Sequence, residues 1–187
     1  ESKPALHPCL VERWLAWRDG KVVGRVMGIV HQAWNEQAGE RTARFFQLDT
    51  IRDAGVVRAL LEAVECWARS QGMDRIIGPF GFSDKDPQGL QVEGFEHLPV
   101  VATPTNPDWL PGLVEACGYS PYEDLVSYRL GLEAVKARDL GPVAERAMRS
   151  LGLRRVEMRS KHALRTWILP VLRLVNMTYS ELLGFVP

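Results

Sequence analysis

The sequence predicts a mixed α/β fold with a mostly antiparallel sheet, one parallel strand-helix-strand unit and flanking helices. An Asp19-Gly20 turn joins two apolar runs, and this dipeptide in that setting is a strong signal for a β-hairpin. An apolar strand at residues 43–48 then leads through a glycine-bearing loop into an amphipathic helix, and a second short strand follows at residues 75–80. Two strands joined across such a helix lie parallel in one sheet.

The first half of the chain supplies the expected sheet. Residues 14–17 and 22–30 are the two hairpin strands. Residues 33–42 are mostly polar and lack periodicity, so a loop is expected there. After Gly55 the apolar residues recur every three or four positions, which predicts a helix with one buried face. Gly72 is expected to end that helix, because the residue past a helix C-terminus often has a positive φ.

The second half predicts a long loop at residues 81–105, followed by helices and strands in alternation. Long loops inside a domain are usually functional or disordered. A helix is expected from Asn106, as its cap, to Gly118, with a kink or restart at Pro111-Gly112. The elements expected after it are a strand at 125–130, a helix at about 142–151, a strand at 153–158, and a helix at about 162–183 that is broken or kinked at Pro170.

Composition excludes several classes of partner. The 23 Lys and Arg residues balance the 23 Asp and Glu residues, so no broad field favours nucleic acid or a membrane, and neither partner is expected. Cys9, Cys66 and Cys117 are far apart, which favours reduced thiols and a cytoplasmic location. The histidines form no close ligand pair, so no metal site is expected. The most apolar run, residues 167–172, is far shorter than the roughly 20 residues that a bilayer requires.

The loop before the long helix is suited to hold a phosphate. Free N–H groups at a helix N-terminus bind anions, and Gly55 lets the backbone approach closely. Residues 52–76 resemble, without a gap, the pyrophosphate loop, helix and following strand of the GNAT superfamily of acyl-CoA-dependent N-acetyltransferases. In that family the loop reads Arg or Gln, two residues, Gly, one residue, then Gly or Ala. Arg52 and Gly55 fit this pattern, whereas Val57 occupies the last small position.

The resemblance covers roughly residues 13–132 through the order of elements, although the first strand and two opening helices of the family have no counterpart before Trp14. A more specific resemblance is to bacterial proteins with two acetyltransferase-like halves. It implies that residues 1–132 form an acetyltransferase-like core without the usual opening elements, and that residues 133–187 form a helix-strand-helix extension leading toward a second half. The motifs that carry it include Gly24-Arg25-Val26, Gly78-Pro79, Glu93-Gly94-Phe95, Asn106-Pro107 and Gly118-Tyr119.

The same resemblance implies a binding site for acetyl-CoA or another acyl-CoA. The loop would hold the pyrophosphate through backbone N–H groups, and the preceding strand would offer its backbone edge to the pantetheine arm. The implied cofactor-binding residues are Phe46, Gln47, Leu48, Arg52, Asp53, Ala54, Gly55, Val56 and Val57. A purely structural strand-glycine-helix junction is the alternative interpretation.

Acyl transfer to an amine needs a base for the amine and an acid for the departing thiolate. The family often supplies the acid from a tyrosine four residues before a Gly-aromatic pair, and Val114 stands at that position here. Asp49 is the best-placed base, with a solvated turn carboxylate as the alternative. Tyr119, Tyr122 and Tyr128 are nearby substitutes for the acid, with Tyr122 as the candidate, and packing aromatic rings are the alternative. Carboxylates of the long loop would favour a cationic acceptor; this group comprises Asp84, Asp86, Glu93 and Glu96, beside His97.

The sequence therefore favours an acyl-CoA-dependent N-acyltransferase that acts on a small-molecule amine or a peptide. A catalytically silent acetyltransferase-like module that binds a ligand or a partner chain is the alternative, and aminoacyl transfer from a tRNA is a weaker third interpretation. The terminal helix carries a wide apolar stripe from Leu164 to Val175. This stripe is expected to pack on the core, on a second acetyltransferase-like half or on another copy of the chain.

Overall fold

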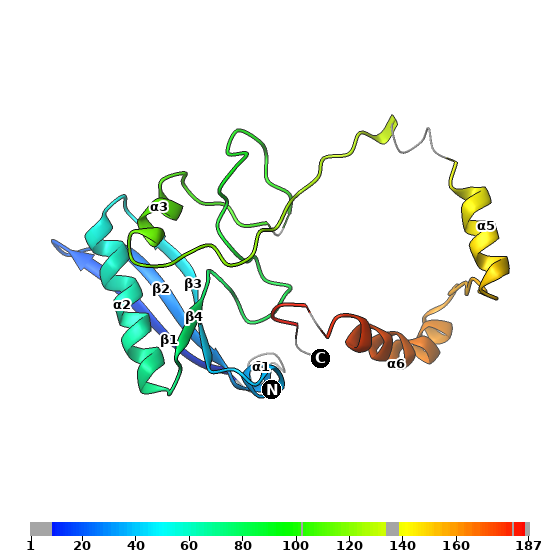
Figure 1. The fold of residues 1–187 in the computed structure, drawn as a ribbon, viewed down its shortest axis with the longest axis horizontal. Helices are drawn as coiled ribbons and strands as arrows, with labels where there is room; N and C mark the ends of the chain where they lie inside the picture. Colours follow the sequence, from blue (N-terminus) through cyan, green and yellow to red (C-terminus); the bar gives the residue numbers. More distant parts are fainter. Residues whose placement is uncertain (1–8, 102, 134–138, 181, 186–187) are drawn as a thin grey trace. The chain divides into compact units, whose positions relative to one another are not determined.

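Four strands form one sheet in the order β1-β2-β3-β4 (Figure 1). The neighbours β1–β2 and β2–β3 are antiparallel and β3–β4 is parallel, which confirms the predicted fold class. The predicted hairpin turn is also confirmed, with positive φ angles of 49° at Asp19 and 73° at Gly20. The strands are β1 (Cys9–Arg18), β2 (Lys21–His31), β3 (Thr42–Thr50) and β4 (Arg75–Ile77).

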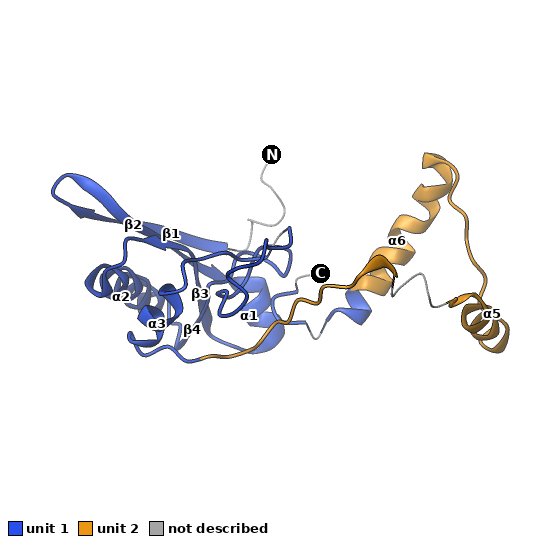
Figure 2. Ribbon diagram, turned by 90° about the horizontal axis from the view of Figure 1, so that it is seen from above, with its two compact units in different colours: residues 1–120, 176–187 blue, residues 121–175 orange. Residues whose placement is uncertain are grey.

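The computed structural model describes residues 9–101, 103–133, 139–180 and 182–185. The chain divides into two compact units (Figure 2). Unit 1 comprises Glu1–Ser120 and Asn176–Pro187 and contains the sheet, and unit 2 comprises Pro121–Val175. Helix α5 (Gly141–Ser150) lies in unit 2, and α6 (Lys161–Thr178) begins there and ends in unit 1.

Helix α2 (Ala54–Ser70) supplies half of the buried residues in the main core cluster of unit 1 and packs across one face of the sheet (Figure 1). Val57, Leu61 and Val64 on its apolar face are fully buried against β2 and β3. Burial of each such side chain contributes about 1.5–3 kcal/mol to stability. The apolar face predicted from the sequence periodicity is therefore the face that packs on the sheet.

Strand β3 contains a bulge that changes which of its side chains reach α2. Arg25 pairs with Asp49 and Met27 pairs with Phe46, so the register shifts between these two pairs. The bulge buries Leu48 and leaves Gln47 exposed with a φ of 50°. Simple alternation would have placed Gln47 on the α2 side together with Phe45, because strand side chains alternate between faces.

The predicted loop at residues 33–42 is wrong, because the structure has a helix, α1 (Gln32–Ala38), in this segment. The ring Nδ1 of His31 accepts a hydrogen bond from the Trp34 N–H and caps the helix start. Gly39, with a φ of 66°, ends the helix in the left-handed conformation. Seven residues are too few for a helical period to stand out from the sequence, and the helix is held by packing and polar contacts to the strands.

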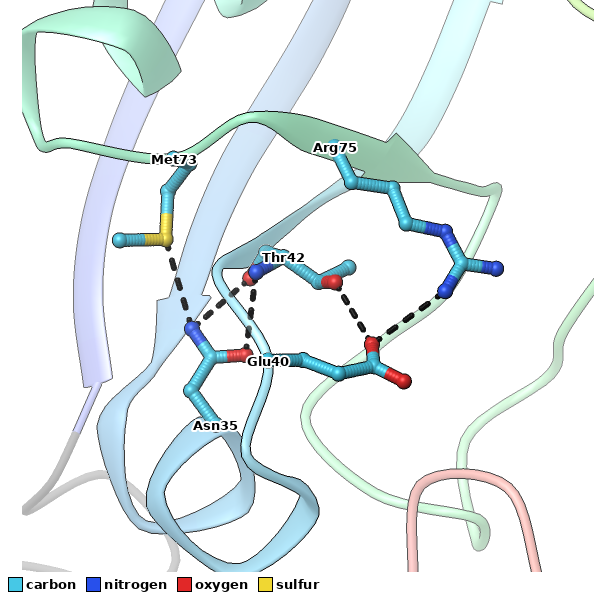
Figure 3. A network of polar contacts seen from close by, with 5 residues as sticks. All are labelled: Asn35, Glu40, Thr42, Met73 and Arg75. Carbon is cyan, nitrogen blue, oxygen red and sulfur yellow. Dashed lines mark hydrogen bonds and ion pairs between the residues drawn. The ribbon is translucent and has the colours of Figure 1, made fainter.

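A polar network ties α1 to the first residues of β3 and β4 (Figure 3). The buried Asn35 amide donates to the Thr42 carbonyl at 3.0 Å and accepts from the Thr42 N–H at 3.3 Å. Glu40 accepts a hydrogen bond from the Thr42 hydroxyl at 2.8 Å and pairs with Arg75 at 3.4 Å. The Asn35 side chain thus completes the backbone hydrogen bonding of Thr42 at the buried start of β3.

Several elements of the second half also differ from the prediction. Helix α3 (Leu110–Glu115) begins later than expected, because Asn106 bonds to the backbone of Gln91 instead of capping a helix. The predicted strands at residues 125–130 and 153–158 are absent, since no described residue pairs with either segment.

Both C-terminal helices form. Helix α5 confirms the helix predicted at about 142–151. Helix α6 runs through Pro170 and ends at Thr178, short of the expected residue 183. Its apolar residues Ile168, Val171 and Leu172 are exposed in the structure, so the expected partner for this stripe remains a proposal.

The last described residues return to the core of unit 1. Phe185 is buried and its ring lies 6.0 Å from the ring of Tyr179. The Gly184 carbonyl accepts a hydrogen bond from Asp84 N–H at 3.3 Å. Gly184 has a φ of 75°, and a Cβ at this position would stand 1.9 Å from the Phe80 ring. A glycine is therefore required where the C-terminal segment crosses Phe80.

We predict that Asn35→Ala lowers the free energy of unfolding by about 1–3 kcal/mol, because it leaves the buried Thr42 N–H and carbonyl without partners. Urea denaturation measures the change. Gln37→Ala, an exposed amide on the same helix, is the matched control and is expected to change stability by less than about 0.5 kcal/mol. Equal losses for the two variants would contradict the role given to Asn35.

Candidate functional site

The candidate site begins where β3 and β4 separate. Their parallel pairing ends at Arg44 and Ile77, and one further hydrogen bond joins the Phe80 N–H to the Phe45 carbonyl at 2.8 Å. A Cβ on Gly78 would stand 2.5 Å from that carbonyl, so only glycine fits at this crossing. Beyond it, among the described residues, residues 46–50 of β3 have no β4 partner.

The three residues that the resemblance assigns to a pantetheine arm lie on this unpaired stretch. Phe46 is half-buried, Gln47 is exposed, and Leu48 is buried in the core. They coincide with the bulge, and a non-glycine residue with a positive φ on a bulge costs conformational energy. The strand therefore presents an irregular backbone edge at the position where a ligand is expected from the sequence.

Helix α2 begins directly after β3, so its N-terminus lies at the end of the same edge. Asp53 is the N-cap, and its Oδ1 accepts hydrogen bonds from Gly55 N–H at 2.8 Å and Val56 N–H at 3.1 Å. These are two of the N–H groups assigned to a pyrophosphate. In this structure a carboxylate of the chain itself satisfies them.

Arg18 holds the Asp53 carboxylate in place from β1. Its Nη1 lies 2.9 Å from Asp53 Oδ2, and this hydrogen bond is the main reason that the pKa of Asp53 is lowered; the bonds from Val56 and Gly55 act in the same direction. The helix N-terminus, the carboxylate and the guanidinium thus form a chain of alternating charge. A phosphate at this position would have to displace the carboxylate.

The remaining loop residues differ in exposure. Arg52 and Ala54 are exposed, and a Cβ on Gly55 would make a tight contact with Asp53 Oδ1, at 3.2 Å. The side chain of Val57 is fully buried in the core, so its branched Cβ faces the sheet.

The two candidate catalytic residues belong to different units. Asp49, on β3, forms an exposed ion pair with Arg25, with Nη2 2.6 Å from Oδ2. Tyr122 is exposed and lies in unit 2. Both assignments stay predictions. Val114, at the position of the family's usual acid, lies on α3 and is buried in the core.

Tyr119 lies close in sequence to the missing acid and has another partner. Its hydroxyl donates to Glu65 Oε1 at 3.3 Å, and its ring packs edge-on against Phe45 at 5.4 Å. Burial, followed by the charge of Glu65, raises the pKa of Tyr119. A raised pKa makes this tyrosine a weaker acid, so its contacts favour a packing role.

The carboxylates of the long loop are engaged locally. Asp86 Oδ2 accepts hydrogen bonds from the backbone N–H groups of Phe82 at 2.8 Å and Ser83 at 3.2 Å. Asp84 forms an ion pair with Lys85. These contacts shape the turn, and their role toward a cationic acceptor stays a prediction.

Arg44, which lies in β3 between Ala43 and Phe45, was given no role by the sequence patterns. The structure buries it completely, with its guanidinium between the rings of Trp34 and Phe80. A charged residue inside an apolar strand was the available signal. It was not sufficient, because the sequence does not show which face of the strand is covered.

Two classes of feature are absent from the part of the chain that the structure describes. No group of His, Cys, Asp or Glu side chains there is arranged to hold a metal ion. None of the described helices combines the length and the apolar character needed to cross a bilayer.

Comparison with curated proteins finds two relatives. Protein YghO of Escherichia coli K12 is 32% identical over 127 residues, which are 68% of this chain and 33% of that protein. A protein of Caulobacter vibrioides named bacterial ceramide synthase is 27% identical over 194 residues, which cover 100% of this chain and 48% of that protein. The chain thus spans between about a third and a half of the length of these relatives. No protein-family model matches the sequence.

Among solved structures, the chain is similar to a tandem GNAT protein from the clavulanic acid biosynthesis pathway. The alignment has 20% sequence identity and a TM-score of 0.36, and it covers 63% of this chain and 29% of that protein. The four-stranded mixed sheet with its parallel β3–β4 pair and flanking helices is compatible with an acetyltransferase-like fold.

We predict a pH-dependent difference in stability between the wild type and Asp53→Asn, because asparagine keeps the cap and removes the charge. The folded pKa of Asp53 is lowered, so its ionised form stabilises the fold above the unfolded pKa of about 3.9, and this contribution is lost as the pH falls through the folded value. Urea midpoints of the wild type should exceed those of the variant near neutral pH and converge in acid. Asp108→Asn, at an exposed carboxylate, is the control, and a gap that persists unchanged into acid would contradict the prediction.

Proposed function

We propose that this chain is part of an acyl-CoA-dependent N-acyltransferase. The observation that supports it is the conjunction of three features at one edge of the sheet: the bulge at Gln47, the separation of β3 from β4, and the N-terminus of α2. An extended thioester cofactor needs a backbone edge for its arm and N–H donors for its diphosphate. Here the edge of β3 and the N-terminus of α2 follow one another along the chain.

The name of the Caulobacter relative supports an amine acceptor. Ceramide is a fatty amide of a long-chain amino alcohol, so a synthase that makes it forms an amide bond on an amine. We propose the same bond formation for this chain, with a long-chain amine as the first acceptor to test. The nitrogen attacks the thioester carbonyl, the C–N bond forms, the C–S bond breaks, and the amine proton passes to a base while the thiolate gains a proton.

Asp49 is the proposed base, because it follows the bulge on β3 and its exposed carboxylate is accessible to an acceptor. Tyr122 is the proposed acid. The acyl-CoA would be held by Phe46, Gln47 and Leu48 along the strand edge and by the loop of residues 52–57 at the helix start. For the diphosphate to bind, Asp53 has to turn away from the N–H groups of Gly55 and Val56.

The second candidate is a catalytically silent module that binds a ligand or a partner chain. The specific observation in its favour is the Asp53 carboxylate, which already satisfies the helix N-terminus and would repel a diphosphate. The burial of Val114 where the family places its acid points the same way.

We expect acetyl-CoA to raise the melting temperature of the wild type, since a ligand that binds only the folded state stabilises it by about 2.7 kcal/mol at one hundred times its dissociation constant. Gly55→Glu should abolish this shift, because it puts a second carboxylate beside Asp53 at the helix start. Gly112→Glu, which adds the same charge at an exposed glycine of α3 with nothing within 4 Å, should keep it. Asp53→Ala should tighten binding by removing the competing carboxylate. No shift in any of the four proteins would favour the silent module.

We expect Asp49→Asn to lower kcat for amide formation by about 100-fold, the usual contribution of a general base, with acyl-CoA binding retained. Release of the CoA thiol, measured with a panel of short- and long-chain amines, gives the rate. Asp74→Asn breaks a comparable exposed ion pair, with Arg41, and is the control. An unchanged kcat in Asp49→Asn would leave this residue as a surface ion pair only.

A further inference from the structure

The guanidinium of Arg44 is fully buried with only part of its hydrogen-bonding capacity used. Its Nη1 donates to the carbonyls of Gly81 at 2.8 Å and Phe82 at 3.2 Å. Its Nε and Nη2 are buried and have no hydrogen-bond partner among the described residues. Buried donors without partners are rare in folded proteins, and each one requires a physical reason.

The position of the guanidinium is fixed on three sides. Its central carbon lies 4.2 Å from the centre of the Phe80 ring and 4.9 Å from that of Trp34, and Nη1 is anchored to the loop carbonyls. Stacking and anchoring of this kind determine the plane in which the remaining donors lie. Nε and Nη2 are on the same edge of an arginine side chain, so the two unused donors point in parallel.

The charge of Arg44 is also uncompensated by direct contact. Burial lowers its pKa to about 10, so it stays protonated at neutral pH. Cys9 and, to a smaller extent, Asp86 favour the cation electrostatically, and the Asp86 carboxylate is engaged with the backbone N–H groups of Phe82 and Ser83. Arg44 forms no ion pair with a described carboxylate. A buried charge without a partner is costly, which points to an anion as the missing component.

We propose that the Nε–Nη2 edge of Arg44 is a binding position for one carboxylate or phosphate group of a ligand. Two parallel N–H donors match the two oxygens of such a group, and this bidentate pairing is among the strongest hydrogen-bonded contacts in proteins. A bound anion would accept hydrogen bonds from the two unused donors, which the aromatic rings hold in one plane. It would also supply the ion-pair partner that Arg44 lacks among the described carboxylates.

The position in the fold relates this site to the candidate site on β3. Arg44 is the last residue of β3 that pairs with β4, and it lies on the face opposite Phe45, which packs toward α2. The anion would therefore sit at the separation of the two strands. Assigning this anion to a substrate of the acyl transfer rests on the proposed function, whereas anion binding itself does not.

The donors are closed off from solvent in this structure, so a ligand enters when the covering residues move. Phe80 covers one face of the guanidinium, and the backbone of Gly184 presses on the Phe80 ring. Gly81 and Phe82 hold Nη1 from the same loop. This cover consists of a loop and the C-terminal segment, which move more readily than the sheet beneath them.

The test is to follow the Arg44 Nε–H signal of the ¹⁵N-labelled chain by NMR during titration with sodium acetate, sodium phosphate or, for ionic strength, sodium chloride. We expect a saturable shift, with a dissociation constant on the order of millimolar, for acetate or phosphate and none for chloride. The anion that saturates at the lower concentration identifies the group. Arg41, which already pairs with Asp74, supplies an internal control whose signal should not saturate.

Two variants separate anion binding from an internal ion pair and from the effect of charge alone. Arg44→Lys keeps a charge but loses the planar fork, so it should weaken anion binding about tenfold, as measured by the anion-induced shift of the melting temperature. Asp86→Asn tests for an internal partner: anion binding should persist in it. The proposal is overturned if neither anion shifts the Arg44 signal, or if Asp86→Asn alone reproduces that shift without any anion. Both outcomes are independent of acetyl-CoA binding, so the proposed acyltransferase can fail while this site stands.

Discussion

The packing of α2 against β3 is the constraint on which the rest of unit 1 depends. Phe45 and Leu48 both reach the core only because the bulge at Gln47 shifts the alternation of the strand by one residue. The same packing places the start of α2 directly after the strand. Burial of the apolar stripe of α2 therefore brings the irregular edge of β3 next to the N-terminus of α2. The candidate site is a consequence of this core packing.

Two positions in this region are electropositive, but only one of them has a carboxylate of the described chain in contact. At the start of α2 the N–H donors are plentiful, and the chain supplies its own carboxylate, Asp53, to satisfy them. At Arg44 a cation is buried with two donors left over and no described carboxylate in contact. Under the proposed function, the first position would have to release its carboxylate before it takes a phosphate, whereas the second has no anion in contact among the described residues.

The two units differ in how far they bury apolar side chains: the described part of unit 2 leaves apolar residues such as Ile168 and Leu172 exposed. The C-terminal segment nevertheless returns to unit 1, where Phe185 is buried and Gly184 contacts Phe80. Phe80 covers Arg44, and Gly184, far away in the sequence, packs on Phe80. The position of the C-terminal segment therefore affects how Arg44 is covered.

The sequence by itself determined the elements whose signals are local. The Asp19-Gly20 turn, the stripe of α2 and the parallel unit around it were predictable, because turn chemistry and periodicity act within a few residues. Only the tertiary structure decided the short helix α1, the absence of strands at 125–130 and 153–158, the bulge and the burial of Arg44. Each of these depends on contacts that a short window does not contain, such as Phe80 for Arg44, and a linear pattern carries no information about which distant groups will meet.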